Sequence, residues 1–388
     1  MKRAFRNWMP CWKRKERRDE RGMHMEYRIL PHGGERISVI GLGTSSLGEA
    51  DEQEVTETVR MALDHGINYI DMASGHAATF SGVGKAIAER RDQVYLQIHF
   101  GADYTSGEYG WTTDPKKIKA AVAWQLDKLQ TDHIDFGFIH CIDEESDLRT
   151  VQENGIIDAI LELKRKGAVR HIGLSSHTPA LVNKVLDMGI LDMVMFSINP
   201  AYDNRHGEYA YGEADERFAL YQRCAKEGVG ISVMKPFCGG QLLDAAKSVF
   251  PKALSKIQCL QYALDQPGVI TVLPGVRDRR DLRELLAYCG ASQQERDYSV
   301  LAQFDAVQQK GRCVYCRHCH PCPAGLDIAL IHKYHDLAVL GDGLAADHYH
   351  HLDKKASDCI RCGHCSSRCP FGADPMKKME EIKAYFGE

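Results

Sequence analysis

The stretch HIDFGFIH, residues 133–140, is a short apolar run that ends in a histidine, and seven comparable runs lie before and after it. They are ISVIGLGT (37–44), INYIDMAS (67–74), VYLQIHFG (94–101), VRHIGLSS (169–176), LDMVMFSIN (191–199), VGISVMKPF (229–237) and VITVLPGV (269–276). Nearly continuous hydrophobicity over so few residues is typical of parallel strands that are buried on both faces. The chain is therefore expected to contain a parallel sheet.

Amphipathic stretches separate these runs and predict helices, as in EVTETVRMALDHG (54–66) and KKIKAAVAWQLDKL (116–129). Several of them end in glycine just before the next run, which is the usual signal for the end of a helix. Eight strand–helix units between residues 37 and 290 predict a (β/α)8 TIM barrel. An open doubly wound sheet would need GxGxxG after its first strand, and GLGTSSLG (41–48) lacks that spacing.

Composition and charge limit the function classes that fit the chain. Its 388 residues carry 49 Lys and Arg against 53 Asp and Glu, a balance that does not indicate nucleic-acid binding. No apolar run is long enough for a membrane span, and no apolar signal-peptide core follows the basic start, so we expect a cytoplasmic protein. Three parts are expected: a basic, disordered tail (1–24), the barrel (25–300) and a cysteine-rich domain (301–388).

Polar side chains end several of the predicted strands. Asp71 follows the second strand, His99 lies near the end of the third, and His140 ends the fourth. Barrel enzymes place their chemistry at the C-terminal ends of the strands, and imidazole titrates near neutral pH. These three residues therefore predict a site that handles protons.

The later strand ends predict a cofactor site. The stretches KPFCGG and PGVRDRRDL combine glycines with cationic side chains after strands seven and eight, where barrels commonly bind phosphate. The candidate cofactor-binding residues from the last four strand ends are Ser175, Ser176, Asn199, Lys235, Gly275, Val276, Arg277 and Arg280.

Over residues 25 to 290 the chain resembles the aldo-keto reductase superfamily, through GLGT, INYIDMAS, HIDFGFIH, HIGLSSH and the PGVR loop. The resemblance implies a nicotinamide cofactor across the mouth of the barrel and an Asp, Tyr, Lys and His tetrad. The aspartate corresponds to Asp71 and the histidine to His140. His76 stands at the tyrosine position and His99 at the lysine position. The family's carboxamide-binding Asn and Gln are replaced by Ser176 and Met195.

These replacements leave three interpretations of the acid–base centre. His76 could donate the proton, with His99 and Asp71 fixing its tautomer or charge. Carbonyl reduction could instead have been lost. The third interpretation is a metal site formed by Asp71, His76, His99 and His140, all of which are acceptable ligands.

Two cysteine runs, CVYCRHCHPCP (313–323) and CIRCGHCSSRCP (359–370), hold eight of the fourteen cysteines. The second run has the bacterial ferredoxin spacing, in which the fourth cysteine ligates the other cluster. Three closely spaced thiolates from one run and one from the other suit each [4Fe–4S] cluster. The two sets are Cys313, Cys316, Cys319 with Cys369, and Cys359, Cys362, Cys365 with Cys322. Two zinc sites are the alternative.

The compact first run resembles that of aldo-keto reductases with a C-terminal ferredoxin-like domain, so a small iron–sulfur domain is expected after the barrel. Clusters pass single electrons and a nicotinamide passes a hydride, so a flavin is the usual converter between them. The cofactor in the barrel is therefore expected to be NADPH or a flavin.

The leading hypothesis is an iron–sulfur oxidoreductase in a cytoplasm with little oxygen. Electrons from a ferredoxin-like carrier would pass through two clusters to a small organic substrate. His76 or His140 would donate the proton. Tyr202, Tyr209 and Tyr211 are expected to cover the barrel mouth. The alternatives are an NADPH-dependent carbonyl reductase with structural clusters, and a non-enzymatic electron-transfer or redox-sensing protein with a degenerate barrel.

Overall fold

The computed structural model describes residues 24–304, 311, 313–339 and 343–388. The predicted basic tail therefore lies outside the described residues, except for its last position. No helix in these ranges is both long enough and apolar enough to cross a membrane.

Eight parallel strands form the central sheet, in the same order along the sheet as along the chain. They are β3 (Leu42–Gly43), β4 (Tyr69–Asp71), β5 (Tyr95–Phe100), β8 (Ile134–Ile139), β9 (Val169–Ser176), β10 (Met193–Ser197), β11 (Gly230–Met234) and β12 (Val269–Val272). The last strand returns to the first, because the amide of Gly41 donates to the carbonyl oxygen of Val272 at 2.9 Å. A second bridge joins Gly43 to Gly275. This closed parallel arrangement is the one expected for a (β/α)8 barrel.

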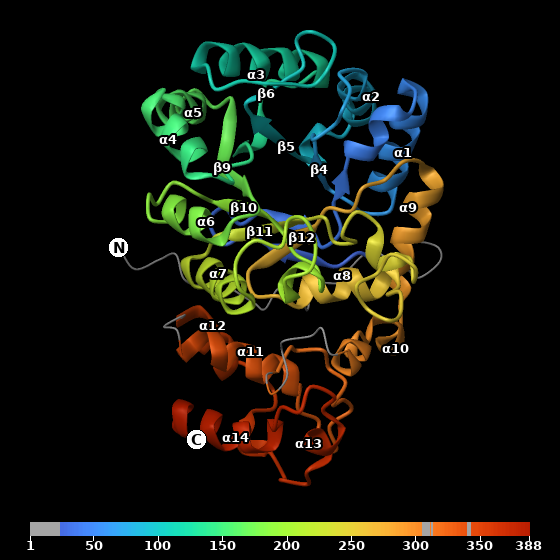
Figure 1. The fold of residues 1–388 in the computed structure, drawn as a ribbon, viewed down its shortest axis with the longest axis vertical. Coiled ribbons are helices and arrows are strands. Elements are labelled where there is room, and N and C mark those ends of the chain that lie inside the picture. The colour runs from blue at the N-terminus through green and yellow to red at the C-terminus, as the bar shows by residue number, and fades with distance from the viewer. Residues whose placement is uncertain (1–23, 305–310, 312, 340–342) are drawn as a thin grey trace.

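Helices surround this sheet, as Figure 1 shows. They are α1 (Glu52–Asp64), α2 (Ala78–Ile87), α3 (Pro115–Leu129), α4 (Glu145–Glu153), α5 (Ile156–Arg165), α6 (Pro179–Leu186), α7 (Ala214–Glu227), α8 (Lys256–Asp265) and α9 (Arg279–Leu286). The two quoted helix patterns agree with α1 and α3 to within two residues. Helix α3 begins where the Asp114 side chain accepts from the amide of Lys116, with proline in its first turn.

The first predicted run differs from the structure. Its beginning belongs to β2 (Arg36–Ser38), which pairs antiparallel with β1 (Tyr27–Ile29), and only two of its residues form β3. The hairpin sends Leu30 and Ile37 into the cluster of apolar side chains that also contains Phe136 and Met193 from the barrel strands. It therefore adds to the barrel interior, which explains why the run begins with an apolar residue well before strand β3.

A second short hairpin lies after strand β5 and was not predicted. It pairs β6 (Ala102–Asp103) with β7 (Gly110–Trp111), and its connecting turn is polar. Strands of only two residues are too short to give a periodic pattern in the sequence. Its position just beyond the C-terminal end of a barrel strand brings its side chains near the barrel mouth.

The C-terminal region is helical and lies against α7 and α8, at the lower end of Figure 1. Its elements are α10 (Gln293–Arg296), α11 (Ile328–Val339), α12 (Gly343–His350), α13 (His364–Arg368) and α14 (Pro375–Phe386). It has its own apolar cluster, which includes Ile331, Tyr349 and Ile382. The rings of Phe218 and Tyr315 face each other across the boundary with the barrel, with 6.4 Å between centroids.

Candidate functional site

A chain of hydrogen bonds joins the ends of three neighbouring strands at the barrel mouth. The Nε2 atom of His99 lies 2.8 Å from Oδ1 of Asp71. The Nδ1 atom of His99 lies 3.2 Å from Nδ1 of His140. Asp71 and His99 are 3% and 2% exposed, so this end of the chain is shielded from water. The structure thus brings together three of the four residues predicted to handle protons.

Sequence reasoning missed the glutamine that supports this group. The Gln97 amide donates to Asp71 Oδ1 at 2.9 Å and accepts from the Tyr69 hydroxyl at 2.7 Å. Gln97 lies two residues before His99 on β5, so both side chains point to the same face. Because side chains two residues apart on a strand share a face, the position of Gln97 relative to His99 could have indicated it.

The sequence also gave no indication of Tyr109, whose hydroxyl lies 2.9 Å from Nε2 of His140. Tyr109 precedes β7 in the hairpin after β5 and is 46% exposed. Burial, and after it the charge of nearby His99, lowers the pKa of His140 to about 3. His140 is therefore neutral over the physiological range, with one ring nitrogen donating and the other accepting.

His76 lies apart from this chain. Its side chain is 48% exposed, and its Nδ1 atom lies 3.5 Å from a carboxylate oxygen of Glu108. The backbones of the same two residues also form a bridge. Among the described residues, no group of three or more His, Cys, Asp or Glu side chains is arranged to hold a single metal ion. The four candidate catalytic residues therefore do not form one compact ligand set.

The candidate cofactor residues on β9 and after β10 bind neighbouring loops. The Ser176 hydroxyl donates to the carbonyl oxygen of Ile142 at 2.6 Å. The Asn199 amide donates to the carbonyl oxygen of Lys235 at 2.9 Å, and its oxygen accepts from the amide of Tyr202 at the same distance. Ser175 is buried. These contacts hold the loops of the mouth in place.

A second polar group includes His177, which follows β9, the sheet neighbour of β8. Its Nδ1 atom lies 2.8 Å from Asp143, and its Nε2 atom is buried without a hydrogen-bond partner among the described residues. The ring of His177 stacks on Tyr209 at 4.5 Å between centroids. The ammonium of Lys235 lies 4.0 Å from the centre of the same tyrosine ring. A buried nitrogen without a partner, near a tyrosine that also contacts a cation, is suited to contact a polar ligand.

Backbone strain also occurs at this end of the barrel. Cys141, Lys235 and Cys238 have φ angles of 47°, 53° and 52°, in the left-handed region that non-glycine residues seldom adopt. They follow strands β8 and β11. Such strain costs about 1–3 kcal/mol per residue and tends to occur at functional sites. Burial raises the pKa of the Cys141 thiol to about 11, so it is protonated at neutral pH.

The predicted phosphate loop lies between β12 and α9. The Arg277 guanidinium bonds both carboxylate oxygens of Asp281, at 2.7 and 3.0 Å, so its charge is already matched. The Arg280 side chain is 84% exposed and lies 3.6 Å from Glu284. A Cβ atom at Gly275 would come within 2.7 Å of the Ser46 hydroxyl, so a larger residue there would require the Ser46 side chain to move. Val276 is buried. Arg280 is thus the guanidinium of this loop that points most fully to solvent.

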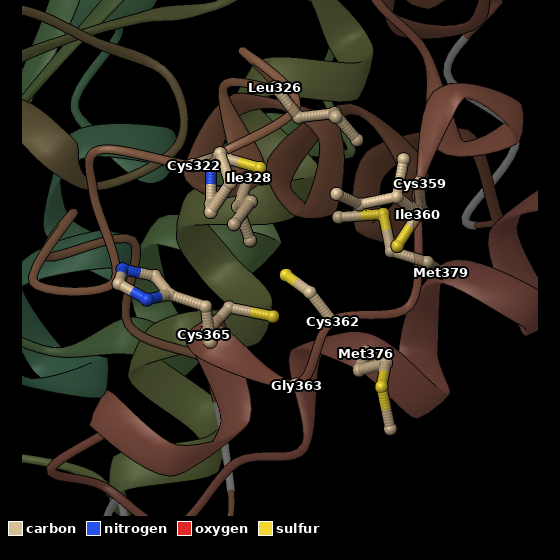
Figure 2. Close-up of a pocket in the computed structure, with 12 residues that line it drawn as sticks. Cys322, Leu326, Ile328, Cys359, Ile360, Cys362, Gly363, Cys365, Met376 and Met379 are labelled. Atoms are coloured by element: carbon tan, nitrogen blue, oxygen red, sulfur yellow. The ribbon is translucent and has the colours of Figure 1, made fainter.

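Figure 2 shows the pocket formed by the second cysteine set. The side chains of Cys362 and Cys365 point toward one open space, with Cys322 and Cys359 on its other sides. Apolar side chains complete the lining, among them Leu326, Ile328, Met376 and Met379. One cysteine of the first run and three of the second therefore line the same pocket.

The first cysteine set lies closer to the barrel. Cys316 and Cys369 pack against the main apolar core. Burial, together with Asp297 and the neighbouring sulfurs of Cys319 and Cys369, raises the pKa of Cys316 to about 12. Cys313 interacts with Cys316 and Cys319 in turn. Cys316 thus lies near Cys319 and Cys369, and Cys319 also lies near Cys365 of the other set.

The aldo/keto reductase family model matches residues 39–253, more than half of the chain. The chain belongs to this family. It is 29% identical over 272 residues to the uncharacterized oxidoreductase YqkF of Bacillus subtilis, covering 64% of this chain and 86% of that protein. It is 25% identical over 296 residues to L-galactose dehydrogenase of Arabidopsis thaliana, covering 68% and 88%.

Among solved structures, the barrel is similar to aldo-keto reductase AKR11C1 from Bacillus halodurans in its holo form. The TM-score is 0.58 at 25% identity, over 70% of this chain and 94% of that one. This family member is thus an aldo-keto reductase-type oxidoreductase.

Proposed function

We propose that this family member is an iron–sulfur oxidoreductase that reduces or oxidises a small organic substrate at the barrel mouth. One observation carries the iron–sulfur part: Cys322, Cys359, Cys362 and Cys365 line a single pocket although they come from separate runs. Cysteine thiolates are the usual ligands of [4Fe–4S] clusters, and an apolar surround is common near such sites. This donor set fits one cluster, and Cys313, Cys316, Cys319 and Cys369 would hold the other.

The exposure of the two cysteine sets supports an order for electron transfer. Cys362 is exposed, and the neighbouring Ile360 is 62% exposed. Cys316 and Cys369 instead pack against the barrel. The set with Cys362 is therefore the better place for a ferredoxin-like carrier to deliver electrons. The set with Cys316 and Cys369 lies closer to the barrel.

At the mouth, Asp71, His99 and His140 would hold and move the substrate proton, and His76 would act at the rim. Lys235 and the unpartnered Nε2 of His177 would orient a polar part of the cofactor or substrate. Arg280 would face a cofactor phosphate. When bound, the clusters would supply single electrons, and NADPH or a flavin would supply hydride equivalents.

A purification without oxygen, followed by cluster absorption spectroscopy, tests this proposal. The expected result is iron and sulfide in the purified protein and bleaching of the clusters by reduced ferredoxin. Bleaching by NADPH would indicate a flavin converter in the barrel. Protein that folds with full iron supply and yet holds no iron would contradict the proposal.

A second candidate is an NADPH-dependent carbonyl reductase in which the clusters are structural. The hydrogen-bonded chain from Asp71 to His140 favours it, because proton transfer at the mouth is what carbonyl reduction needs. A variant with Cys362 replaced by serine separates the two candidates. Unchanged NADPH-dependent turnover would favour structural clusters, and lost turnover in a folded protein would favour the electron relay.

A further inference from the structure

We propose that Tyr109 is the residue that exchanges a proton with the substrate, as the outer end of a relay through His140 and His99 to Asp71. Three contacts make the chain continuous, at 2.9, 3.2 and 2.8 Å. The inference rests on the proposed function, because it needs a hydroxyl or carbonyl group at the barrel mouth. It deepens that function by assigning the terminal proton donor to a residue outside the matched family motifs.

The direction of each hydrogen bond follows from the carboxylate. When Asp71 is ionised it only accepts, so Nε2 of His99 carries a hydrogen and Nδ1 of His99 accepts. The Nδ1 atom of His140 then donates, which leaves Nε2 of His140 to accept from the hydroxyl of Tyr109. In this state all three neutral groups donate toward Asp71.

This orientation is ready to take up a proton from the substrate. In alcohol oxidation, the substrate hydroxyl proton passes to the oxygen of Tyr109 while the Tyr109 proton passes to Nε2 of His140. The Nδ1 proton of His140 moves to Nδ1 of His99, and the His99–Asp71 ion pair then holds the extra proton. The substrate carbon gives its hydride, and with it two electrons, to an oxidised nicotinamide. Carbonyl reduction is the reverse, with a reduced nicotinamide as hydride donor and Tyr109 as proton donor.

The burial of the chain fits this assignment. Asp71 and His99 are enclosed and His140 is partly exposed, whereas Tyr109 is 46% exposed at the mouth, so the phenol is the most exposed member of the chain. Because His140 remains neutral at physiological pH, it can pass a proton without trapping one. Burial and nearby Cys141 raise the pKa of Tyr109, which keeps the resting phenol protonated.

The hairpin that carries Tyr109 also places the neighbouring groups. Glu108 pairs with His76, and the next strand ends in the half-exposed Trp111. The ring of Tyr104 lies 5.8 Å from the ring of Tyr109, between centroids, and the Tyr104 hydroxyl donates to the carbonyl oxygen of Ser74. Tyr104 therefore anchors the hairpin next to the Tyr109 ring, and this anchoring helps to keep Tyr109 in contact with His140.

The first test compares Tyr109→Phe with Tyr95→Phe, which removes a phenol at the opposite end of strand β5. Activity is followed with NADPH, 4-nitrobenzaldehyde and a panel of small aldehydes and ketones. For Tyr109→Phe we expect kcat to fall about 10²–10⁴-fold, as for a lost general acid, with KM and NADPH binding little changed. Tyr95→Phe should retain full activity. Equal turnover by wild type and Tyr109→Phe would overturn the assignment and leave the proposed function standing.

The second test asks whether the residues act as one unit. In a relay, the double variant Tyr109→Phe/His140→Gln should lose no more activity than the more impaired single variant. If the activity losses of the two single variants multiply in the double variant, Tyr109 acts independently of His140, and the relay is overturned.

A spectroscopic readout keeps the inference testable without turnover. In ¹⁵N NMR of the histidine rings, Nε2 of His140 should be unprotonated in the wild type and change its shift when Tyr109→Phe removes the donor. A protonated Nε2, or an unchanged shift, would overturn the relay. If the wild type turns over none of the carbonyl compounds, the proposed reductase activity fails, whereas the ¹⁵N result still decides the hydrogen-bond chain.

Discussion

The ammonium group of Lys333 lies 2.8 Å from the carbonyl oxygen of Asp265, and this contact joins helix α11 to the end of helix α8. Burial, and after it the guanidinium of Arg28, lowers the pKa of Lys333 to about 7. The barrel and the C-terminal region are therefore held together partly by a lysine whose charge is disfavoured in the folded state.

This contact predicts a pH dependence of stability. An unfolded lysine keeps its proton up to about pH 10.4, whereas folded Lys333 releases it near pH 7. The unfolded state binds more protons between these values, so stability contributed through Lys333 should rise from pH 7 to pH 10. In chemical denaturation, the stability of wild type relative to Lys333→Met should increase over that range. The exposed Lys354→Met should show no such trend, and a flat difference for Lys333→Met would refute the expectation.

The assignment of the cysteines to two sets predicts which cluster each cysteine-to-serine variant loses. Wild-type protein should hold about eight iron atoms per chain, for two [4Fe–4S] clusters. Cys322→Ser and Cys362→Ser should each lower this to about four and leave the same electron paramagnetic resonance signal. Cys369→Ser should leave the other signal, and Cys289→Ser should leave both clusters in place. If Cys322→Ser and Cys369→Ser retained the same cluster, the assigned pairing would be wrong.

A buried ion pair holds the loop over the barrel mouth. Arg217 is fully buried, and its Nε donates to Asp203 at 2.8 Å; the same carboxylate accepts from the hydroxyls of Tyr221 and Tyr262. Asp203→Ala leaves the guanidinium unpaired and should lower the free energy of unfolding by about 3–5 kcal/mol. Lys184→Ala, which breaks an exposed pair with Glu145, should cost about 0–1 kcal/mol. If thermal or urea unfolding gave similar losses of unfolding free energy for the two variants, the buried pair would not be the stronger contribution.

Tyr209 is expected to influence substrate choice, because its ring contacts both His177 and Lys235. Tyr209→Ala should change the ratio of kcat/KM for aromatic and small aliphatic carbonyl substrates by about tenfold, a typical effect of reshaping a pocket. Tyr209→Phe keeps the ring and should change the ratio by less than about twofold. Parallel changes for both substrate classes would place Tyr209 outside the substrate pocket.

Much of the barrel follows from local patterns. The eight apolar runs mark the eight sheet strands, and the glycine after helix α7, Gly228, takes the left-handed conformation that its position in the sequence predicts. Asp71, His99 and His140 could be placed at one mouth because parallel strands bring their C-terminal ends together. The spacing of the two cysteine runs was also enough to propose that Cys322 meets Cys359, Cys362 and Cys365.

The partners of these residues depended on tertiary structure. Nothing in the sequence around Tyr109 indicates that its hydroxyl meets His140, because a loop's course is set by distant contacts and not by a repeat. The docking of Lys333 against Asp265 is equally non-local. Short apolar runs thus marked the strands, since they record burial along the chain. Only the folded structure decided which side chains from separate loops and helices come within hydrogen-bonding distance, because that distance is set by packing between elements.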